Sequence, residues 1–585
     1  MKPTSYSLIC ATLTVTAMSS HADQTRNGTA TNLNLAGAWT SGVLPGTGDI
    51  ALWDSNSTLS NTLAGAQTWG GLNTSGASGA VTITTSANLV LDHSTDANTA
   101  FNVGSNNFSW SGNTAFHING AAGVVSTNPG ATFAGSSMVT ITSSGTKNWS
   151  TNASTNGVTN LTFTGTLQLR GAAIPAIGIL STNWLALGGG GGQGSNNGTL
   201  VQTGSFSLDT GDATSCGSFV LTHAFAGQYL KLSSLSGTGS VRSDWGADNT
   251  AGTQLRGIEL SQSGNTVLSG SILSHNSNVQ NRGIDFVKKG TGTLTLTGGL
   301  GSSQTIGSRL SKLNFNVQEG TLQWGNGTTN ITYVNAANWD GTSTFNIGAN
   351  GTFRIAANGA FDFSRTLTGG TGIFEVASGT VTASKSSTSF AGTVKVTGGT
   401  LKLGVADAIS GSSQIIVGAS TTLDVSGVSW TLGSSQTLSG VGTVAGNATI
   451  AGDLAPGSSP GALTFNNDLD LTSTSEWLVE IGGTGTSDFD RLLVTGSLDA
   501  GGQIKVSLIN GFNPANYSSF DIANFASFTD SGYGFDFTGA PLDPGLSWDT
   551  SAFSTTGTIA VIPEQSVALL GGIGALLLLR RRKGR

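Results

Sequence analysis

Short stretches in which apolar residues alternate with threonine or serine recur along most of the chain. Val139–Thr142 and Leu161–Thr164 are two examples, and Gly, Asn and Ser residues bound such stretches. Alternation with a period of two, rich in β-branched residues, is typical of strands with one buried face. No 3.6-residue periodicity longer than two turns precedes residue 567. The pattern therefore predicts an almost all-β body.

A five-residue unit, Gly-Thr-apolar-any-apolar, repeats along this body. Its copies begin at Gly165, Gly292, Gly320, Gly351, Gly379 and Gly399. From residue 292 the copies lie 28, 31, 28 and 20 residues apart. Self-similarity at such a period indicates a solenoid or a propeller. The uneven spacing favours a parallel β-solenoid, because each coil needs only its inward strand in register while its turns vary in length.

The N-terminus has the features of a signal peptide. Lys2 precedes the apolar stretch Leu8–Met18, and the small residues Ser20 and Ala22 follow. This order predicts a signal peptide over residues 1–22, cut between Ala22 and Asp23. A buried first strand is the alternative interpretation of the same stretch.

The C-terminus combines an apolar run with a basic end. Val567–Leu579 contains only apolar residues and Gly, and we expect it to form a short hydrophobic helix. Thirteen helical residues span about 20 Å, so flanking residues and snorkelling arginines would have to complete a membrane crossing. Positive charge stays on the cytoplasmic side and would hold the body outside; it is supplied by Arg580, Arg581, Arg582, Lys583 and Arg585.

Charge and cysteine content narrow the class of protein further. Charged residues make up 9% of the 585 residues, against roughly 25% in an ordinary soluble domain. Without residues 1–22 and 563–585, the body would hold 18 basic and 30 acidic residues, a formal charge of −12. An acidic body argues against nucleic acid as a partner. Cys216 would be the only cysteine left, so repetition rather than an internal disulfide must stabilise the fold.

Asp488 and Asp490 form the strongest candidate for a catalytic pair. They are two residues apart, so on a strand they would face the same side, with Arg491 beside them. Glycoside hydrolysis needs two carboxylates about 5–10 Å apart. The favoured interpretation is a polar turn that enters the strand Leu492–Val494. The sequence therefore predicts no catalytic residue.

Other chemical candidates also have a structural interpretation that is favoured. Asp244, Trp245 and Arg242 would suit a sugar-binding patch, but a packed Trp beside an exposed ion pair is the favoured interpretation. Asn466–Asp470 lacks the Gly and distal Glu of a calcium loop. No metal spacing relates the four histidines of the body, His93, His117, His223 and His275. We therefore predict no cofactor and no metal.

Two parts of the body resemble known repeat sequences. Lys288–Gly298, closing with Glu319–Leu322, and Phe390–Leu403 resemble the autotransporter-associated β-strand repeat. Leu454–Gly461 followed by Phe489–Gly496 is similar to what comes after such repeats in passenger domains. The resemblance implies a right-handed parallel β-helix exposed at the cell surface. It also implies a division of the body into 23–200 (cap and irregular solenoid), 201–445 (repeats) and 446–562 (C-terminal β unit).

The tail resembles the PEP-CTERM sorting signal. Pro563 and Glu564 precede the apolar run and the Arg-rich end, so residues 563–585 have the three parts of that signal. Gln565 stands where a second Pro is typical, which leaves cleavage at this motif open. The resemblance implies an exosortase-type sorting enzyme as a partner, next to signal peptidase, in a Gram-negative bacterium that makes extracellular polysaccharide.

Taken together, these features predict an exported surface or matrix protein without enzymatic activity. Its work would be adhesive or structural, with extracellular polysaccharide as a partner and the membrane contacted through residues 567–579. A polysaccharide-degrading β-helix enzyme is the alternative from a different class. A passive surface-layer protein, which would self-assemble without any glycan, is a third possibility.

Overall fold

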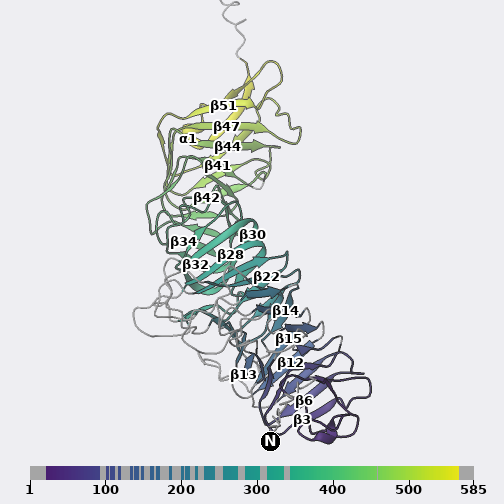
Figure 1. The fold of residues 1–585 in the computed structure, drawn as a ribbon. Helices are drawn as coiled ribbons and strands as arrows, with labels where there is room; N and C mark the ends of the chain where they lie inside the picture. The colour runs from purple at the N-terminus through teal and green to yellow at the C-terminus, as the bar shows by residue number, and fades with distance from the viewer. Residues whose placement is uncertain are drawn as a thin grey trace, which may run out of the picture. The chain divides into compact units, whose positions relative to one another are not determined.

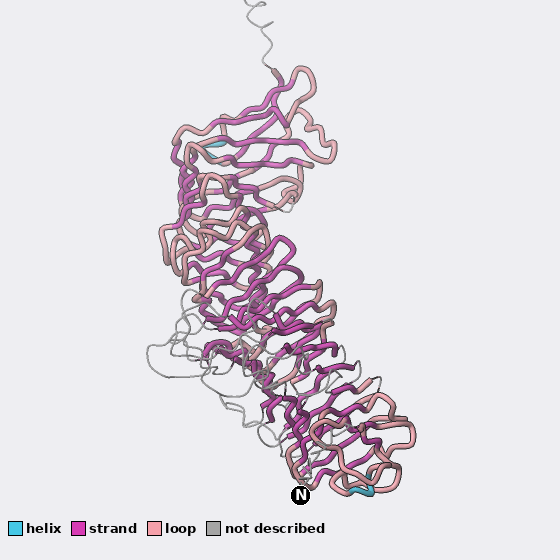
Figure 2. Tube along the Cα trace, viewed as in Figure 1, coloured by secondary structure: helices cyan, strands magenta, loops and turns pink. Residues whose placement is uncertain are grey.

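The structure is a computed structural model in which strands dominate (Figure 2). It describes residues 22–92, 101–104, 106–111, 116–119, 132–135, 138–143, 147–149, 158–163, 166–171, 184–187, 199–202, 204–210, 218–221, 229–243, 255–274, 283–302, 312–334, 343–457 and 459–564. The chain forms two compact units, one of residues 1–166, 186–191 and 198–204, the other of residues 167–185, 192–197 and 205–585.

The first unit contains three parallel sheets, and successive coils add one strand to each of them. One contains β1 (Gln24–Thr25), β2 (Ile50–Leu52), β5 (Gly71–Asn73), β8 (Phe101–Asn102), β11 (Thr132–Gly135), β14 (Val158–Phe163) and β17 (Thr199–Gln202). The second has β3 (Ser60–Leu63), β6 (Val81–Thr85), β9 (Phe108–Ser111) and β12 (Met138–Ser143), and the third has β4 (Gln67–Trp69), β7 (Leu89–Asp92) and β10 (Phe116–Asn119). Consecutive strands thus join different sheets, as a solenoid requires.

A tryptophan cluster fills the first coils of this unit. Trp39 packs edge-on against Trp53 and Trp69, with ring centroids 5.9 and 5.6 Å apart. Arg26 lies buried beside them and donates from Nε to Oδ1 of Asn61 at 2.8 Å. The sequence leads one to expect a strand, a turn and a second strand over residues 35–54, since Trp39 and Trp53 flank Pro45-Gly46, and the structure has only the second strand, β2. Residues 36–38 form the short 3-10 helix η1 (Ala36–Ala38) instead.

In the second compact unit, the Gly-Thr repeats pair with one another from coil to coil. They form two separate ladders. In β26 (Thr293–Leu296), β28 (Lys312–Trp324) and β30 (Thr344–Phe363), Thr293, Thr321 and Thr352 are in register. In β32 (Ile373–Ala383) and β34 (Thr400–Leu403), Thr380 pairs with Thr400, and both belong to a ladder that starts near the end of β30. The long strand β30 therefore takes part in both ladders, which the sequence spacing alone did not indicate.

Glycine is required where these units turn into the strand. Gly399 has a φ of +74°, which L-residues with a Cβ rarely adopt. A Cβ there would also collide with the carbonyl oxygen of Gly379 in the preceding coil. The Gly of the repeat thus permits both the corner and the close stacking of coils.

Lys288, in the first stretch that resembles the repeat, holds two coils together from inside. Its side chain is buried, and Nζ donates to the carbonyl oxygens of Lys289 at 2.8 Å, Gly290 at 2.6 Å and Glu319 at 3.2 Å. Burial lowers its pKa to about 8, although Glu319 opposes the shift. The three carbonyl acceptors stabilise the ammonium group where water is absent.

After residue 421 the coils have three distinct faces, and strands of one of them, face 2, follow one another through the green and yellow part of the ribbon in Figure 1. Face 1 consists of β37 (Trp430–Leu432), β40 (Ala448–Ile450), β43 (Leu469–Leu471), β46 (Ser497–Ala500) and β50 (Ser527–Asp530). Face 2 consists of β38 (Thr437–Gly440), β41 (Asp453–Pro456), β44 (Glu476–Ile481), β47 (Gln503–Leu508) and β51 (Gly534–Gly539). Face 3 consists of β36 (Thr422–Asp424), β39 (Thr443–Ala445), β42 (Ala462–Phe465), β45 (Arg491–Val494) and β49 (Ala523–Asn524).

Alternate apolar residues of these strands point into the coils and form the core. Phe286, Phe315 and Phe345 follow one another in successive coils, with ring centroids 5.7 and 5.1 Å apart. Trp324 packs edge-on against Phe345 at 4.8 Å and is buried, as are most described tryptophans. The predicted all-β parallel solenoid is confirmed by these parallel pairings. Its right-handed winding stays a prediction, and the hydrophobic helix over 567–579 lies outside the described residues.

An antiparallel sheet and a short helix close the last coil. β48 (Ser519–Asp521) and β52 (Leu546–Asp549) pair with β53 (Thr558–Pro563). Phe553 of α1 (Phe553–Thr556) is buried and packs against Phe535 at 5.1 Å and Tyr533 at 5.3 Å. Aromatic rings therefore cover the interior that the final strands would otherwise expose.

Candidate functional site

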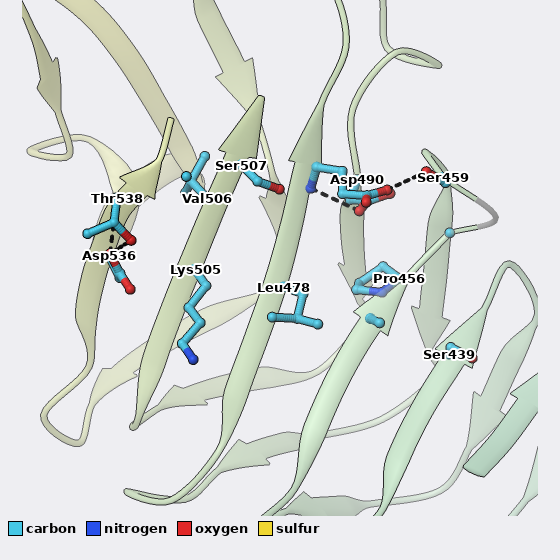
Figure 3. A pocket seen from close by; sticks show the side chains of 14 residues that line it. Ser439, Pro456, Ser459, Leu478, Asp490, Lys505, Val506, Ser507, Asp536 and Thr538 are labelled. Carbon is cyan, nitrogen blue, oxygen red and sulfur yellow. Dashed lines mark hydrogen bonds between the residues drawn. The ribbon is translucent and has the colours of Figure 1, made fainter. Parts of the chain in front are cut away.

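The face 2 groove is a hollow of about 480 Å³ over the outward side of face 2 (Figure 3). The strand register places Leu478, Lys505 and Asp536 side by side, one from each of three successive coils. Lys505 forms an ion pair with Glu476 at 2.7 Å. Other lining residues are Ser439, Ala455, Pro456, Gly457, Ser459, Glu480, Asp490, Val506, Ser507, Thr538 and Gly539.

Asp490 is the most deeply buried of the acids that line the groove. Its side chain is 2% exposed, Oδ1 accepts a hydrogen bond from the backbone N–H of Gly461 at 2.8 Å, and Oδ2 accepts one from that of Glu480 at 3.0 Å. Burial raises the pKa of Asp490 to about 7, the two N–H donors oppose this shift, and the nearby Glu480 carboxylate adds to it. The carboxyl group therefore links two backbone segments that are far apart in sequence.

The turn that Asp490 holds is the Pro-Gly-rich segment at the end of β41. A Cβ on Gly457 would collide with Oδ1 of Asp490, so only glycine lets the carboxyl group come this close. Ser459 donates from its hydroxyl to Oε2 of Glu480 at 2.6 Å, and the N–H of Arg491 donates to the carbonyl of Gly461 at 2.9 Å. The stretches Leu454–Gly461 and Phe489–Gly496 are thus adjacent. Hydrogen bonds of Asp490 and of the Arg491 backbone to Gly461 join them.

Asp488 and Asp490, the candidate pair of the sequence, have different surroundings and different hydrogen-bond partners. Asp488 is exposed in the preceding turn, where Oδ2 accepts from the backbone N–H of Gly485 at 3.0 Å. Arg491 pairs with Asp521 at 2.6 Å instead of contacting either acid. The favoured interpretation of a polar turn entering β45 agrees with these contacts. The acid that lies near Asp490 is instead Glu480 of β44, whose backbone N–H donates to Oδ2 of Asp490.

The residues predicted for processing lie at the edges of the described chain. Ala22 and Asp23 are exposed, and the backbone N–H of Ala22 donates to Oδ1 of Asp49 at 3.0 Å. Pro563 and Glu564 are exposed at the end of β53. Arg580, Arg581 and Arg582 lie outside the described residues.

Several other sequence candidates also lie outside the described part of the chain. These are Cys216, Asp244, Trp245, His93, His223 and His275, together with the side chain of His117 on β10. Across the residues that are described, no group of three or more His, Cys, Asp or Glu side chains could hold a metal ion. Within the same residues, no helix is long and apolar enough to cross a membrane.

No protein-family model matches this chain, and no curated protein matches it.

Proposed function

We propose that the protein is an exported structural protein of the bacterial surface or extracellular matrix, whose solenoid binds or scaffolds polysaccharide. The observation that carries this proposal is the series of parallel coils, which presents equivalent outward positions about 4.8 Å apart. Such a surface suits an extended polymer, because contacts made to one sugar can be made again one coil further along.

The predicted export and sorting signals support the same location. Ala22–Asp23 and Pro563–Glu564 are exposed at either end of the described chain, so both would be accessible to processing enzymes. In this proposal signal peptidase cuts after Ala22. An exosortase-type enzyme acts at Pro563–Glu564 while Arg580, Arg581 and Arg582 hold the tail on the cytoplasmic side of the inner membrane.

Fractionation of the native host, with mass spectrometry of both mature termini, tests the proposal. We expect protein outside the cell that begins at Asp23 and ends near Pro563. Protein confined to the inner membrane with an intact end at Arg585 would contradict the sorting step and indicate a tethered periplasmic protein instead.

A polysaccharide-degrading enzyme is the second candidate, favoured by one observation. Asp490, with its pKa raised to about 7, lies near Glu480 in the face 2 groove, and a carboxylic acid with a raised pKa beside a second carboxyl group suits glycoside hydrolysis. Against this, both oxygens of Asp490 already accept backbone hydrogen bonds. Incubation with acidic and neutral glycans, with and without calcium, separates the two functions. Release of reducing or unsaturated ends would establish an enzyme.

A further inference from the structure

A second groove lies on the outward side of face 1 and encloses about 610 Å³. We call it the face 1 groove. Its floor is a ladder in which Thr431, Thr449, Asp470 and Asp499 are in register across four successive coils. The residues that precede them in each strand point inward and are buried, so the four polar side chains point outward. The ladder repeats at about 4.8 Å, close to the length of one sugar ring.

Amide side chains form one wall of this groove. Asn467 donates from Nδ2 to Oδ1 of Asn447 one coil away, at 3.1 Å, and both residues are exposed. Each amide keeps further donor and acceptor capacity. The wall and floor together offer the mixed donors and acceptors that bind sugar hydroxyl groups.

The two carboxylates of the ladder lack a positively charged partner in the groove. No Lys or Arg is among the described residues that line it. Oδ1 of Asp499 is shielded from solvent yet accepts no hydrogen bond from the part of the chain that the structure describes. Burial, and then the charge of Asp499, raise the pKa of Asp470, while a hydrogen bond from Thr449 opposes the shift. Two like charges held close together without a counter-charge are unfavourable, so a ligand that brings positive charge and hydrogen-bond donors into the groove would be favoured there.

We infer that the face 1 groove binds a polysaccharide that carries free amino groups, laid along the coil axis with its ammonium groups at Asp470 and Asp499. Thr431, Thr449, Asn447 and Asn467 would bind the hydroxyl groups of the same sugars. The inference rests on the proposed function and specifies its ligand class. Neutral polymers supply no charge to the two carboxylates, and uronate polymers are repelled by them.

Binding of chitin oligosaccharides to the purified protein tests this inference. The probes are a partly N-deacetylated oligosaccharide and its fully N-acetylated counterpart, compared by calorimetry at mildly acidic pH, where sugar amines are protonated. The variant is Asp470→Asn with Asp499→Asn, which keeps side-chain size. The matched control, Asp453→Asn with Glu476→Gln on face 2 but outside its groove, removes the same charge elsewhere.

We expect the deacetylated probe to bind, the acetylated probe to bind at least about tenfold more weakly, and the face 1 variant to lose about tenfold or more. The face 2 control should bind as the unchanged protein does. Equal binding of both probes would overturn the inference. An equal loss of binding in the control would also overturn it, because binding would then depend only on the net charge of the protein. Binding of calcium alone at the two aspartates, without any oligosaccharide, would also overturn it.

A wider panel distinguishes failure of this inference from failure of the proposed function. If the protein retains neutral or acidic polymers, and the face 1 variant retains them equally well, the inference is overturned and the polysaccharide-binding role stands. Retention of no polymer of any charge would overturn both.

Discussion

Asp490 directly precedes β45 and Asp499 lies on the next strand, β46, yet their surroundings differ. Asp490 in the face 2 groove is 2% exposed and accepts two backbone hydrogen bonds. Asp499 in the face 1 groove has an oxygen that accepts none from the described residues. Both oxygens of Asp490 accept backbone hydrogen bonds and hold the turn at Gly461, whereas no described donor contacts Oδ1 of Asp499. Hydrogen bonding, rather than the mere presence of acids in a groove, separates a stabilising carboxyl group from a binding one.

Replacement of Asp490 should have the largest effect. At pH 5, Asp490→Ala leaves the buried N–H groups of Gly461 and Glu480 without acceptors, and we expect a loss of about 3 kcal/mol in unfolding free energy. Urea unfolding and amide exchange at these two residues measure the loss. Asp488→Ala, in the exposed turn, is the control and should cost under about 1 kcal/mol. A similar loss in both variants would show that Asp490 has no special role.

Lys288→Met extends the comparison to a buried cation. The change leaves three carbonyl acceptors in the coil interior without their donor, and we expect a loss of about 2 kcal/mol at pH 7. Because the folded pKa is about 8, below the unfolded value of 10.5, the unfolded state binds more protons between them. Stability from this site should therefore rise with pH over that range, and the Met variant should lack the rise. An identical pH profile for both proteins would contradict the account.

The pH dependence of Asp490 sharpens the first prediction. Its folded pKa of about 7 lies above the unfolded value of 3.8, so the folded state keeps the proton up to a higher pH than the unfolded state does. Stability from this site is present below about pH 4 and falls as pH rises toward 7. Glu480, Lys505 and Asp536 line the same groove; the hydrogen bond to Glu476 raises the pKa of Lys505 and the backbone N–H of Thr538 lowers that of Asp536, so both shifts lead away from this range. The stability difference between the unchanged protein and Asp490→Ala should narrow from pH 5 to pH 8 in urea titrations, and a difference that widens would refute the assignment.

The smallest effect on stability is expected for the face 1 ladder. Asp470→Asn removes one of two neighbouring like charges at an exposed position, so the unfolding free energy should stay within about 0.5 kcal/mol or rise. Thermal unfolding of the single variant checks this. A large loss would mean that the carboxylate supports the fold, which would remove the contrast with Asp490.

The solenoid was predictable from the sequence because the period-two alternation and the Gly-Thr repeat are both local patterns. Period-two alternation at sites such as Leu294 and Leu401 predicts inward residues, and these are buried. The split of the Gly-Thr units into two ladders was not predictable, since it depends on how β30 pairs with the strands on both sides. Alignment between coils is set by turn lengths, and these have no simple sequence signature.

The candidate sites depended on that same alignment. Asp490 was recognisable as a polar residue before a strand, but its partner Gly461 could not be inferred from spacing. Asp470 and Asp499 belong to different coils and become neighbours only through the pairing of β43 with β46. Side chains that converge across coils therefore had to be found in the structure.

Hydrogen–deuterium exchange of the purified protein, with and without the deacetylated chitin oligosaccharide, tests most directly whether the two grooves differ in role. The account predicts slower exchange in β43 and β46 of face 1 when the oligosaccharide is present, and unchanged exchange at Gly461 and Glu480 beside Asp490. Protection confined to the face 2 groove, or no protection on face 1, would contradict it.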